Sequence, residues 1–228
     1  MRKRALVTGA SSGIGAAVVD RLLRDGWSVV GISRSDPGLD TPDFRHCPAD
    51  LADPASLGTA LAALAPVDAL VHAAGVLRVG RLEADTVADA RAMWRLHVEA
   101  ATQLVQWAVP NLPQGGRIVL LGSRVASGAP GRGQYAASKA ALVGLARSWA
   151  AELAPRAITV NVVAPGATDT PMLRDPARSG VAPTVPPLGR FVRPGEVAGM
   201  VAFLLSEDGG STTGQSLVMC GGSSLQGG

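Results

Sequence analysis

The chain of 228 residues is 47% hydrophobic, and its formal net charge at pH 7 is only +3. This length suits one domain with ample material for a core, and no apolar run approaches the roughly 18 residues that a membrane span requires. The basic residues are scattered along the chain, whereas a nucleic-acid-binding protein gathers them on one face, so we expect neither nucleic acid nor a membrane as a partner.

Short apolar runs alternate with alanine-rich or amphipathic runs along the chain. The apolar runs predict strands at residues 4–8, 27–33, 45–48, 67–73, 117–121, 157–163 and 215–219. The intervening runs predict helices that end at Gly26, cover 54–64 and 86–109, follow Gln134, and cover 196–205. Strands that alternate with helices pair in parallel and carry helices on both faces of the sheet.

The fold that follows is α/β, a single Rossmann-type doubly wound parallel sheet with helices on both faces. No internal repeat or linker divides the sequence, so we expect one domain over residues 1–228. Its least regular part, about residues 166–194, is rich in Pro, Gly and Arg and predicts a short lid over the site.

The two cysteines, Cys47 and Cys220, provide neither a disulfide framework nor the spacing of a metal site. This usage is typical of a reducing compartment, so we expect a cytoplasmic protein without a bound metal. The basic and then apolar start of the chain resembles an export signal, but its apolar stretch ends at Gly9, and we reject that interpretation.

The only tyrosine, Tyr135, precedes Lys139 by four residues, and Lys139 is one of only two lysines. Residues four apart share one face of a helix, so both side chains can reach one spot. A neighbouring ammonium lowers the pKa of a phenol from about 10 towards a range useful for proton transfer. Ser123 follows the predicted strand 117–121, where its hydroxyl can bind a substrate oxygen. Taken alone, the pair also fits a half-buried aromatic residue beside a solvated charge.

Residues 8–15, TGASSGIG, lie between the first predicted strand and the first predicted helix. Glycines at such a turn let backbone N–H groups approach a pyrophosphate, and the helix N-terminus adds a favourable dipole. The alternative is a plain turn. The position of the motif favours dinucleotide binding, and the residues that we expect to contribute are Gly9, Ser11, Ser12, Gly13, Ile14 and Gly15.

Ser33 and Arg34 follow the second predicted strand, where a protein that binds a ribose 2′-hydroxyl carries an acidic residue. A guanidinium instead matches the oxygens of a 2′-phosphate. We therefore expect NADP(H) as the preferred cofactor, with NAD(H) possible. A solvated loop arginine is the alternative, because arginine is abundant in this chain.

Together the motifs resemble the classical short-chain dehydrogenase/reductase family over essentially the whole chain. The combination is specific, although no single motif is. The matching segments are Thr8-Gly9-(x)3-Gly13-Ile14-Gly15, Asp50-Leu51, Ala73-Ala74-Gly75, Ser123, Tyr135-(x)3-Lys139, Asn161, Pro165-Gly166 with Thr170, Arg190, Pro194-Gly195-Glu196-Val197 and Thr213-Gly214-Gln215.

The resemblance implies an oxidoreductase that interconverts a small ketone or aldehyde and the corresponding alcohol. Ser123 would hold the substrate oxygen, Tyr135 would transfer the proton, and Lys139 would bind the nicotinamide ribose. The further residues expected to contact the cofactor are Asp50, Leu51, Ala74, Gly75, Pro165, Gly166, Thr168 and Thr170. The family also implies a homo-oligomer, a tetramer or possibly a dimer, formed through the long helices around 94–107 and 135–153.

Three positions depart from the family pattern. His72 replaces the first asparagine of Asn-Asn-Ala-Gly, which we interpret as structural, and Cys220 replaces an acidic or amide residue, which we interpret as packing. His97 stands where the family has a helix asparagine that anchors a water of the proton relay. An imidazole can also hold a water or pass protons near neutral pH. The alternative is a buried histidine satisfied by a carbonyl, with no relay role, and both interpretations stay open. We expect the replacement of the asparagine to alter pH dependence rather than to abolish turnover.

Substrate specificity is expected to depend on residues 125–134 and on the lid. The lid arginines Arg174 and Arg178 fit a substrate with a carboxylate or phosphate, or are simply solvated. Two other functions remain open. One is a 3-oxoacyl-(acyl-carrier-protein)-type reductase of fatty acid or polyketide synthesis, since arginines would meet an acidic carrier. The other is a non-catalytic NADP(H)-binding scaffold or sensor, suggested by His97.

Overall fold

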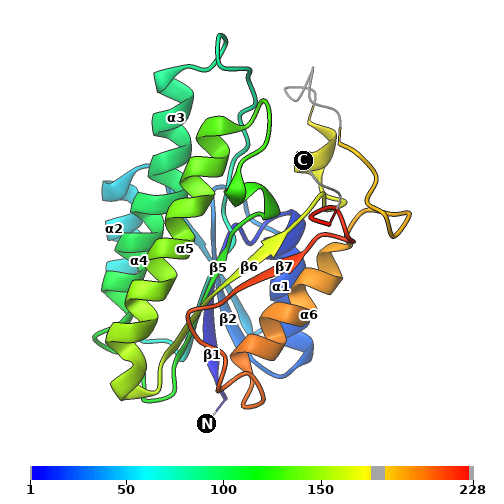
Figure 1. Cartoon of the computed structure of the whole chain (residues 1–228). Coiled ribbons are helices and arrows are strands. Elements are labelled where there is room, and N and C mark those ends of the chain that lie inside the picture. Colours follow the sequence, from blue (N-terminus) through cyan, green and yellow to red (C-terminus); the bar gives the residue numbers. More distant parts are fainter. Residues whose placement is uncertain (1, 176–182, 226–228) are drawn as a thin grey trace.

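The computed structural model of the protein describes residues 2–175 and 183–225. Within them lies a seven-stranded sheet of order β3-β2-β1-β4-β5-β6-β7, in which every pair of neighbours is parallel (Figure 1). The strands are β1 (Arg4–Thr8), β2 (Ser28–Ser33), β3 (Phe44–Pro48), β4 (Ala69–His72), β5 (Arg117–Leu121), β6 (Thr159–Pro165) and β7 (Ser216–Met219).

Helices cover both faces of this sheet. The helices are α1 (Gly13–Arg24), α2 (Pro54–Ala62), α3 (Val87–Trp94), α4 (Ala100–Ala108), α5 (Gly133–Leu153) and α6 (Pro194–Leu205). Figure 1 shows α2, α4 and α5 on one face and the pair α1 and α6 on the other. The predicted doubly wound parallel sheet is therefore confirmed.

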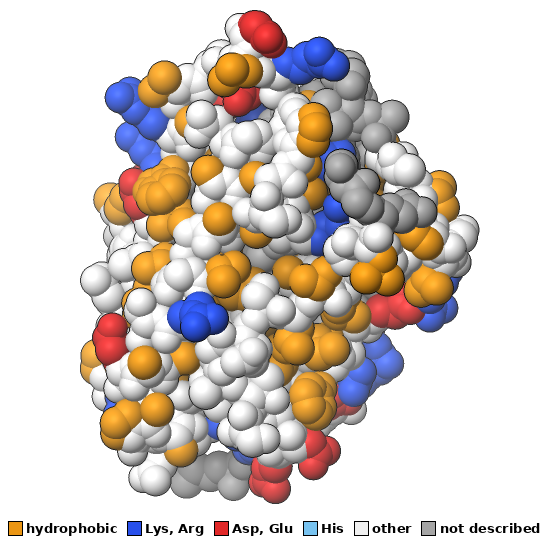
Figure 2. Space-filling view, viewed as in Figure 1, with side chains coloured by type: hydrophobic (Ala, Val, Ile, Leu, Met, Phe, Trp, Pro, Cys, Tyr) orange, Lys and Arg blue, Asp and Glu red, His pale blue; other side chains and the backbone are white. Residues whose placement is uncertain are grey.

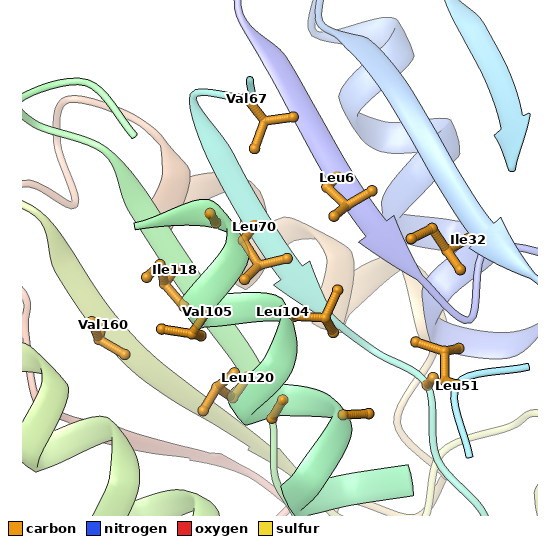
Figure 3. Packing of buried hydrophobic residues seen from close by; sticks show 14 of the residues in the cluster. Leu6, Ile32, Leu51, Val67, Leu70, Leu104, Val105, Ile118, Leu120 and Val160 are labelled. Carbon is orange, nitrogen blue, oxygen red and sulfur yellow. The ribbon is translucent and has the colours of Figure 1, made fainter. Parts of the chain in front are cut away.

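One face of the sheet is packed by leucines and other aliphatic side chains from neighbouring strands. Leu6 pairs with Leu70, Leu70 pairs with Ile118, and Ile118 pairs with Val160 in the strand register. All four side chains are buried in one cluster with Leu104 of α4 (Figure 3). Because successive residues of a strand point to opposite faces, this register sends every second residue of β1, β4, β5 and β6 to the same layer.

The alternate residues of the same strands form a second core beneath α1 and α6. Val7, Val71 and Val119 are buried there with Val18 of α1 and Val201 of α6. Strands buried on both faces read as continuous apolar runs, which is why the sequence predicts them without a polar–apolar alternation. No helix among residues 2–175 and 183–225 is long and apolar enough to cross a membrane.

The predicted helix over residues 86–109 is found as one continuous helical run, but it contains a π-helical turn that was not predicted. Helix α3 ends at Trp94, Arg95–Glu99 form a π-helical turn, and α4 begins at Ala100. A π-helical turn adds a residue to the local repeat and is often found at functional sites. Nothing in the hydrophobic pattern marks it, because the apolar residues on either side keep ordinary helical spacing.

Candidate active site

The three predicted catalytic side chains Ser123, Tyr135 and Lys139 line one cavity of about 170 Å³. It lies outside the carboxyl ends of the parallel strands, near the point where the strand order reverses between β1 and β4. Open α/β sheets bind their ligands in this crevice. The predicted cofactor residues that line the same cavity are Ile14, Gly75, Pro165, Gly166, Thr168 and Thr170.

Tyr135 and Lys139 lie one turn apart on α5, as predicted from their spacing. The Lys139 ammonium is 5.8 Å from the centroid of the Tyr135 ring, and its Nζ donates a hydrogen bond of 2.8 Å to the Leu121 carbonyl. Burial of the side chain, only 3% exposed, lowers the pKa of Lys139 to about 7. Lys139 therefore changes charge near neutral pH, beside the only phenol of the chain.

Ser123 follows β5 directly and is the N-cap of a short 3₁₀ helix, Arg124–Ser127. Its Oγ accepts a long hydrogen bond of 3.4 Å from the Val125 N–H. The half-buried hydroxyl lines the cavity, and none of the described residues that line this cavity is acidic. It is available to donate a hydrogen bond to a substrate oxygen.

His97 lies on the π-helical turn and is fully buried behind the cavity. Its Nε2 accepts a hydrogen bond of 3.1 Å from the Val76 N–H, so the proton of the neutral ring is on Nδ1. That Nδ1–H lies 2.9 Å from Ser138 Oγ, which in turn donates to the Tyr135 carbonyl at 2.8 Å. The imidazole stands edge-on to the Tyr135 ring, with centroids 5.6 Å apart.

Burial, and then the charge of Lys139, hold the pKa of His97 well below its usual value. The imidazole is therefore neutral at pH 7 and holds three parts of the site in place: the chain after β4, α5 and the tyrosine ring. Its partners are an amide and a hydroxyl, and neither is the carbonyl that the packing interpretation expected. A role of His97 in proton relay remains a prediction.

His72, at the end of β4, is also fully buried. Thr8 Oγ1 accepts from two amides, Ala73 N and Ala74 N, and so donates its own proton to His72 Nδ1 at 2.9 Å. His72 Nε2 donates to the Leu96 carbonyl at 3.1 Å. Burial and the Lys139 charge lower the pKa of His72 to about 3. This neutral ring joins β1, β4 and the π-helical turn, which agrees with a structural role.

The turn between β1 and α1 fits a cofactor pyrophosphate. Gly9 has φ of +69°, and a Cβ there would lie 2.9 Å from the Ala74 backbone; a Cβ on Gly15 would lie 2.1 Å from the Gly9 carbonyl oxygen. Only glycine permits these approaches. The N-cap residue of α1, Ser12, makes no capping hydrogen bond, and no acidic residue occupies the first turn. The N–H groups of this helix end therefore remain available to an anion.

The other predicted cofactor residues follow neighbouring strands at the same edge of the sheet. Asp50 is exposed after β3, with Leu51 buried beside it, and Gly75 follows β4. A Cβ on Gly75 would lie 3.2 Å from His97 Nε2, so a larger residue would crowd the imidazole, and it would be in ordinary contact with Lys139 Nζ at 3.6 Å. Ser11, Gly13 and Ala74 belong to the turns around β1 and β4 described above.

Ser33 and Arg34 lie at the end of β2, but only Arg34 is exposed there. Ser33 is 4% exposed, and its hydroxyl donates to the Ser35 carbonyl at 2.8 Å and lies 3.2 Å from His46 Nε2. Its side chain therefore faces inward, and recognition of a 2′-phosphate would depend on the Arg34 guanidinium.

In the predicted lid, Pro171–Arg174 form a short 3₁₀ helix, and Met172 and Leu173 line the cavity. The Arg174 side chain is 74% exposed and pairs with Asp169 at 2.5 Å, outside the cavity. This fits the solvated interpretation of Arg174. Arg178 and Val181 of the predicted lid, residues 166–194, lie outside the described residues.

The sequence did not single out several residues that build the site. Arg124 and Leu77 line the cavity, and Ser138 connects His97 to α5. Arg124 had a signal, because it follows Ser123 directly. Ser138 had none, since a serine on a helix is ordinarily solvated.

Cys220 packs against Gly166, because a Cβ built on Gly166 would lie only 2.9 Å from the Cys220 Cα. Burial raises the pKa of the thiol, but the hydrogen bonds from Ser224 and Gly222 and the Arg124 charge together lower it by more, so its pKa is below the usual value. Arg124, a basic residue, is thus close to Cys220 in space although it is distant from it in sequence. Within the described chain, no group of three or more His, Cys, Asp or Glu side chains is arranged to hold a metal.

Comparison with known proteins gives matches over most of the chain. Residues 9–224 match the family model described as "Enoyl-(Acyl carrier protein) reductase". The 3-oxoacyl-(acyl-carrier-protein) reductase FabG of Salmonella typhimurium is 38% identical over 237 residues, covering 96% of both chains. The enzyme of the same name from Escherichia coli is 36% identical over 236 residues, with the same coverage.

Two solved structures have the same fold. A blue fluorescent protein from a metagenomic library, in complex with NADPH, has a TM-score of 0.86 at 38% identity and covers 96% of this chain and 97% of its own. A short chain dehydrogenase from Burkholderia cenocepacia, in complex with NADP, has a TM-score of 0.84 at 36% identity with the same coverage. With these relatives, and with its cavity at the switch point of the sheet, the chain belongs to the short-chain dehydrogenase/reductase family.

Proposed function

We propose that this oxidoreductase interconverts a ketone or aldehyde and the corresponding alcohol, with NADP(H) as the preferred cofactor. The observation that carries the proposal is the single cavity shared by Ser123, Tyr135 and Lys139 beside the glycine turn of α1. The chemistry that a bound nicotinamide supplies is hydride transfer to or from the substrate carbon.

The residues of the chain handle the oxygen and its proton. The Ser123 hydroxyl donates a hydrogen bond to the substrate oxygen and polarises the carbonyl. The Tyr135 hydroxyl gives its proton to this oxygen during reduction and takes it back during oxidation. When protonated, Lys139 stabilises the phenolate that Tyr135 leaves, because its ammonium lies 5.8 Å from the ring centroid.

The cofactor preference rests on Arg34 and on the relatives. The exposed guanidinium at the end of β2 suits a 2′-phosphate, and no acidic residue stands at that position. Two solved structures at 36% and 38% identity are complexes with NADP or NADPH. NAD(H) can occupy the same turn, and use of NADH in preference to NADPH would contradict this part of the proposal.

The second candidate is reduction of a carrier-linked 3-oxoacyl group. It is favoured by the names of the relatives from Salmonella typhimurium and Escherichia coli. The description of the matching family model names a carrier-linked enoyl substrate instead, but a serine and a tyrosine that line one cavity suit a carbonyl better. Turnover of carrier-linked but not free ketones would select this candidate.

The test is a panel of carbonyls and alcohols followed at the nicotinamide absorbance, with NADPH and NADH in parallel. With any substrate found, Tyr135→Phe should lower turnover by roughly 100- to 10,000-fold, because it removes the proton donor and little volume. Tryptophan fluorescence should show that the variant still binds NADPH. Near-normal turnover of the phenylalanine variant would show that the assigned proton donor is wrong.

A further inference from the structure

Arg124 lies on the wall of the catalytic cavity, and no acidic residue of the described chain pairs with it. It follows Ser123 directly, is half-buried, and lines the cavity together with Tyr135 and Lys139. No ion pair joins it to any described carboxylate. Arg174 and Arg190, by contrast, pair with nearby carboxylates at the surface.

The charged side chains among the described lining residues of this cavity are all basic. Three basic side chains contribute to it, Arg124, Arg132 and Lys139, and no described lining residue is an aspartate or glutamate. Figure 2 shows Lys or Arg side chains in a recess just right of the centre of the view. A half-buried guanidinium without a counter-ion is costly unless a ligand supplies the negative charge.

The cofactor pyrophosphate is an unsuitable source of that charge. The glycine turn follows β1, whereas Arg124 follows β5, and β4 lies between these two strands in the sheet. The pyrophosphate is expected at the helix end after β1. The group that Arg124 meets is therefore on the substrate side of the cavity.

We infer that Arg124 binds a carboxylate of the substrate, so that the preferred substrates are short oxo acids and the corresponding hydroxy acids. A guanidinium matches a carboxylate with two parallel hydrogen bonds. Ser123, which binds the carbonyl, and Arg124, which binds the carboxylate, are consecutive residues, and consecutive Cα atoms are about 3.8 Å apart. This places the carboxylate a few bonds from the reacting carbonyl. The inference rests on the proposed function, since it names the substrate class of the same site.

Recognition is tested by calorimetry, apart from turnover. Tyr135→Phe protein saturated with NADPH is titrated with 2-oxobutanoate and 3-oxobutanoate, and with the methyl ester of each. At least one acid should bind roughly 10- to 100-fold more tightly than its ester, as expected for hydrogen bonds to a charged group. Adding Arg124→Gln should abolish that preference, and Arg124→Lys should keep part of it.

The matched control is Arg147→Gln, which removes an exposed arginine of α5 that does not line the cavity. It should leave the preference intact. Equal affinity for acid and ester, no binding of either, or a preference that survives Arg124→Gln would overturn the inference. So would wild-type turnover that favours a carrier-linked 3-oxobutyryl thioester over the free acid. Absence of any turnover in the wild-type panel would instead count against the proposed oxidoreductase reaction, whatever the titrations show.

Discussion

Burial of Lys139 disfavours the charged form of its side chain. The side chain is 3% exposed, and its Nζ donates a hydrogen bond to the Leu121 carbonyl. Desolvation lowers its pKa to about 7, from 10.5 in an open chain. The unfolded protein therefore binds one more proton than the folded protein between these two values, and stability rises with pH across that window. Below pH 7 both states are protonated, and the full cost of burying the ammonium is present.

We therefore expect Lys139→Met to stabilise the cofactor-free protein. The gain in the free energy of unfolding should be on the order of 2–4 kcal/mol at pH 6 and should shrink as pH rises from 7 towards 10. Urea unfolding at several pH values measures it. The control is Lys3→Met, since Lys3 is the only other lysine and is exposed. A Lys139→Met protein no more stable than wild type at pH 6 would contradict the expectation. Turnover should fall even as stability rises.

At the scale of elements, the glycine turn before α1 determines how closely this helix approaches β1. A Cβ on Gly15 would lie 2.1 Å from the carbonyl oxygen of Gly9, and both groups belong to the backbone. Neither can move without shifting the helix or the strand. The turn was predictable from sequence because its glycines occur at a fixed spacing after a strand. The π-helical turn Arg95–Glu99 was not, and the hydrogen bonds of its His97 to Val76 and Ser138 join segments that are distant in sequence.

Gly15→Ala should therefore weaken NADPH binding by at least about tenfold and lower the melting temperature, because a sub-van-der-Waals contact must be relieved by moving α1 away from the pyrophosphate site. Fluorescence titration and thermal unfolding measure the two effects. Gly144→Ala is the matched control, since a Cβ at this position of α5 meets nothing within 4 Å. It should bind NADPH normally and gain up to about 1 kcal/mol, because alanine favours a helix. Equal behaviour of the two variants would refute the packing argument.

For the whole molecule, the parallel sheet with helices on both faces followed from the alternation of apolar runs, and the edge that carries the site followed from the motifs, whereas the order of the strands comes from the structure. What could not be predicted was the buried network behind the site. His72 and His97 gave no signal of their partners, because Thr8, Leu96 and Ser138 are distant from them in sequence or unremarkable in type. Ser33 illustrates the same limit, since only the structure shows its hydroxyl turned inward.

The two buried histidines have a consequence for the stability of the whole fold. Burial lowers the pKa of His72 from 6.5 to about 3, and that of His97 falls in the same direction. Both rings are neutral in the folded state, whereas the unfolded chain protonates them as pH falls through 6.5. Their contribution to stability is complete above pH 6.5 and is lost as pH falls towards the folded pKa.

We expect the free energy of unfolding to decrease between pH 6.5 and pH 5, where most carboxylates are still ionised, by about 1.4 kcal/mol per pH unit for each histidine. His72→Asn should remove about half of this slope, and the double variant with His97→Asn should remove nearly all of it. Urea unfolding at intervals of half a pH unit gives the slopes directly. Each variant is compared with its own value at pH 7.5, so any stability lost with the hydrogen bonds does not affect the result. A wild-type curve that is flat from pH 6.5 to 5, or a double variant as steep as wild type, would mean that the rings do not stay neutral in the folded protein.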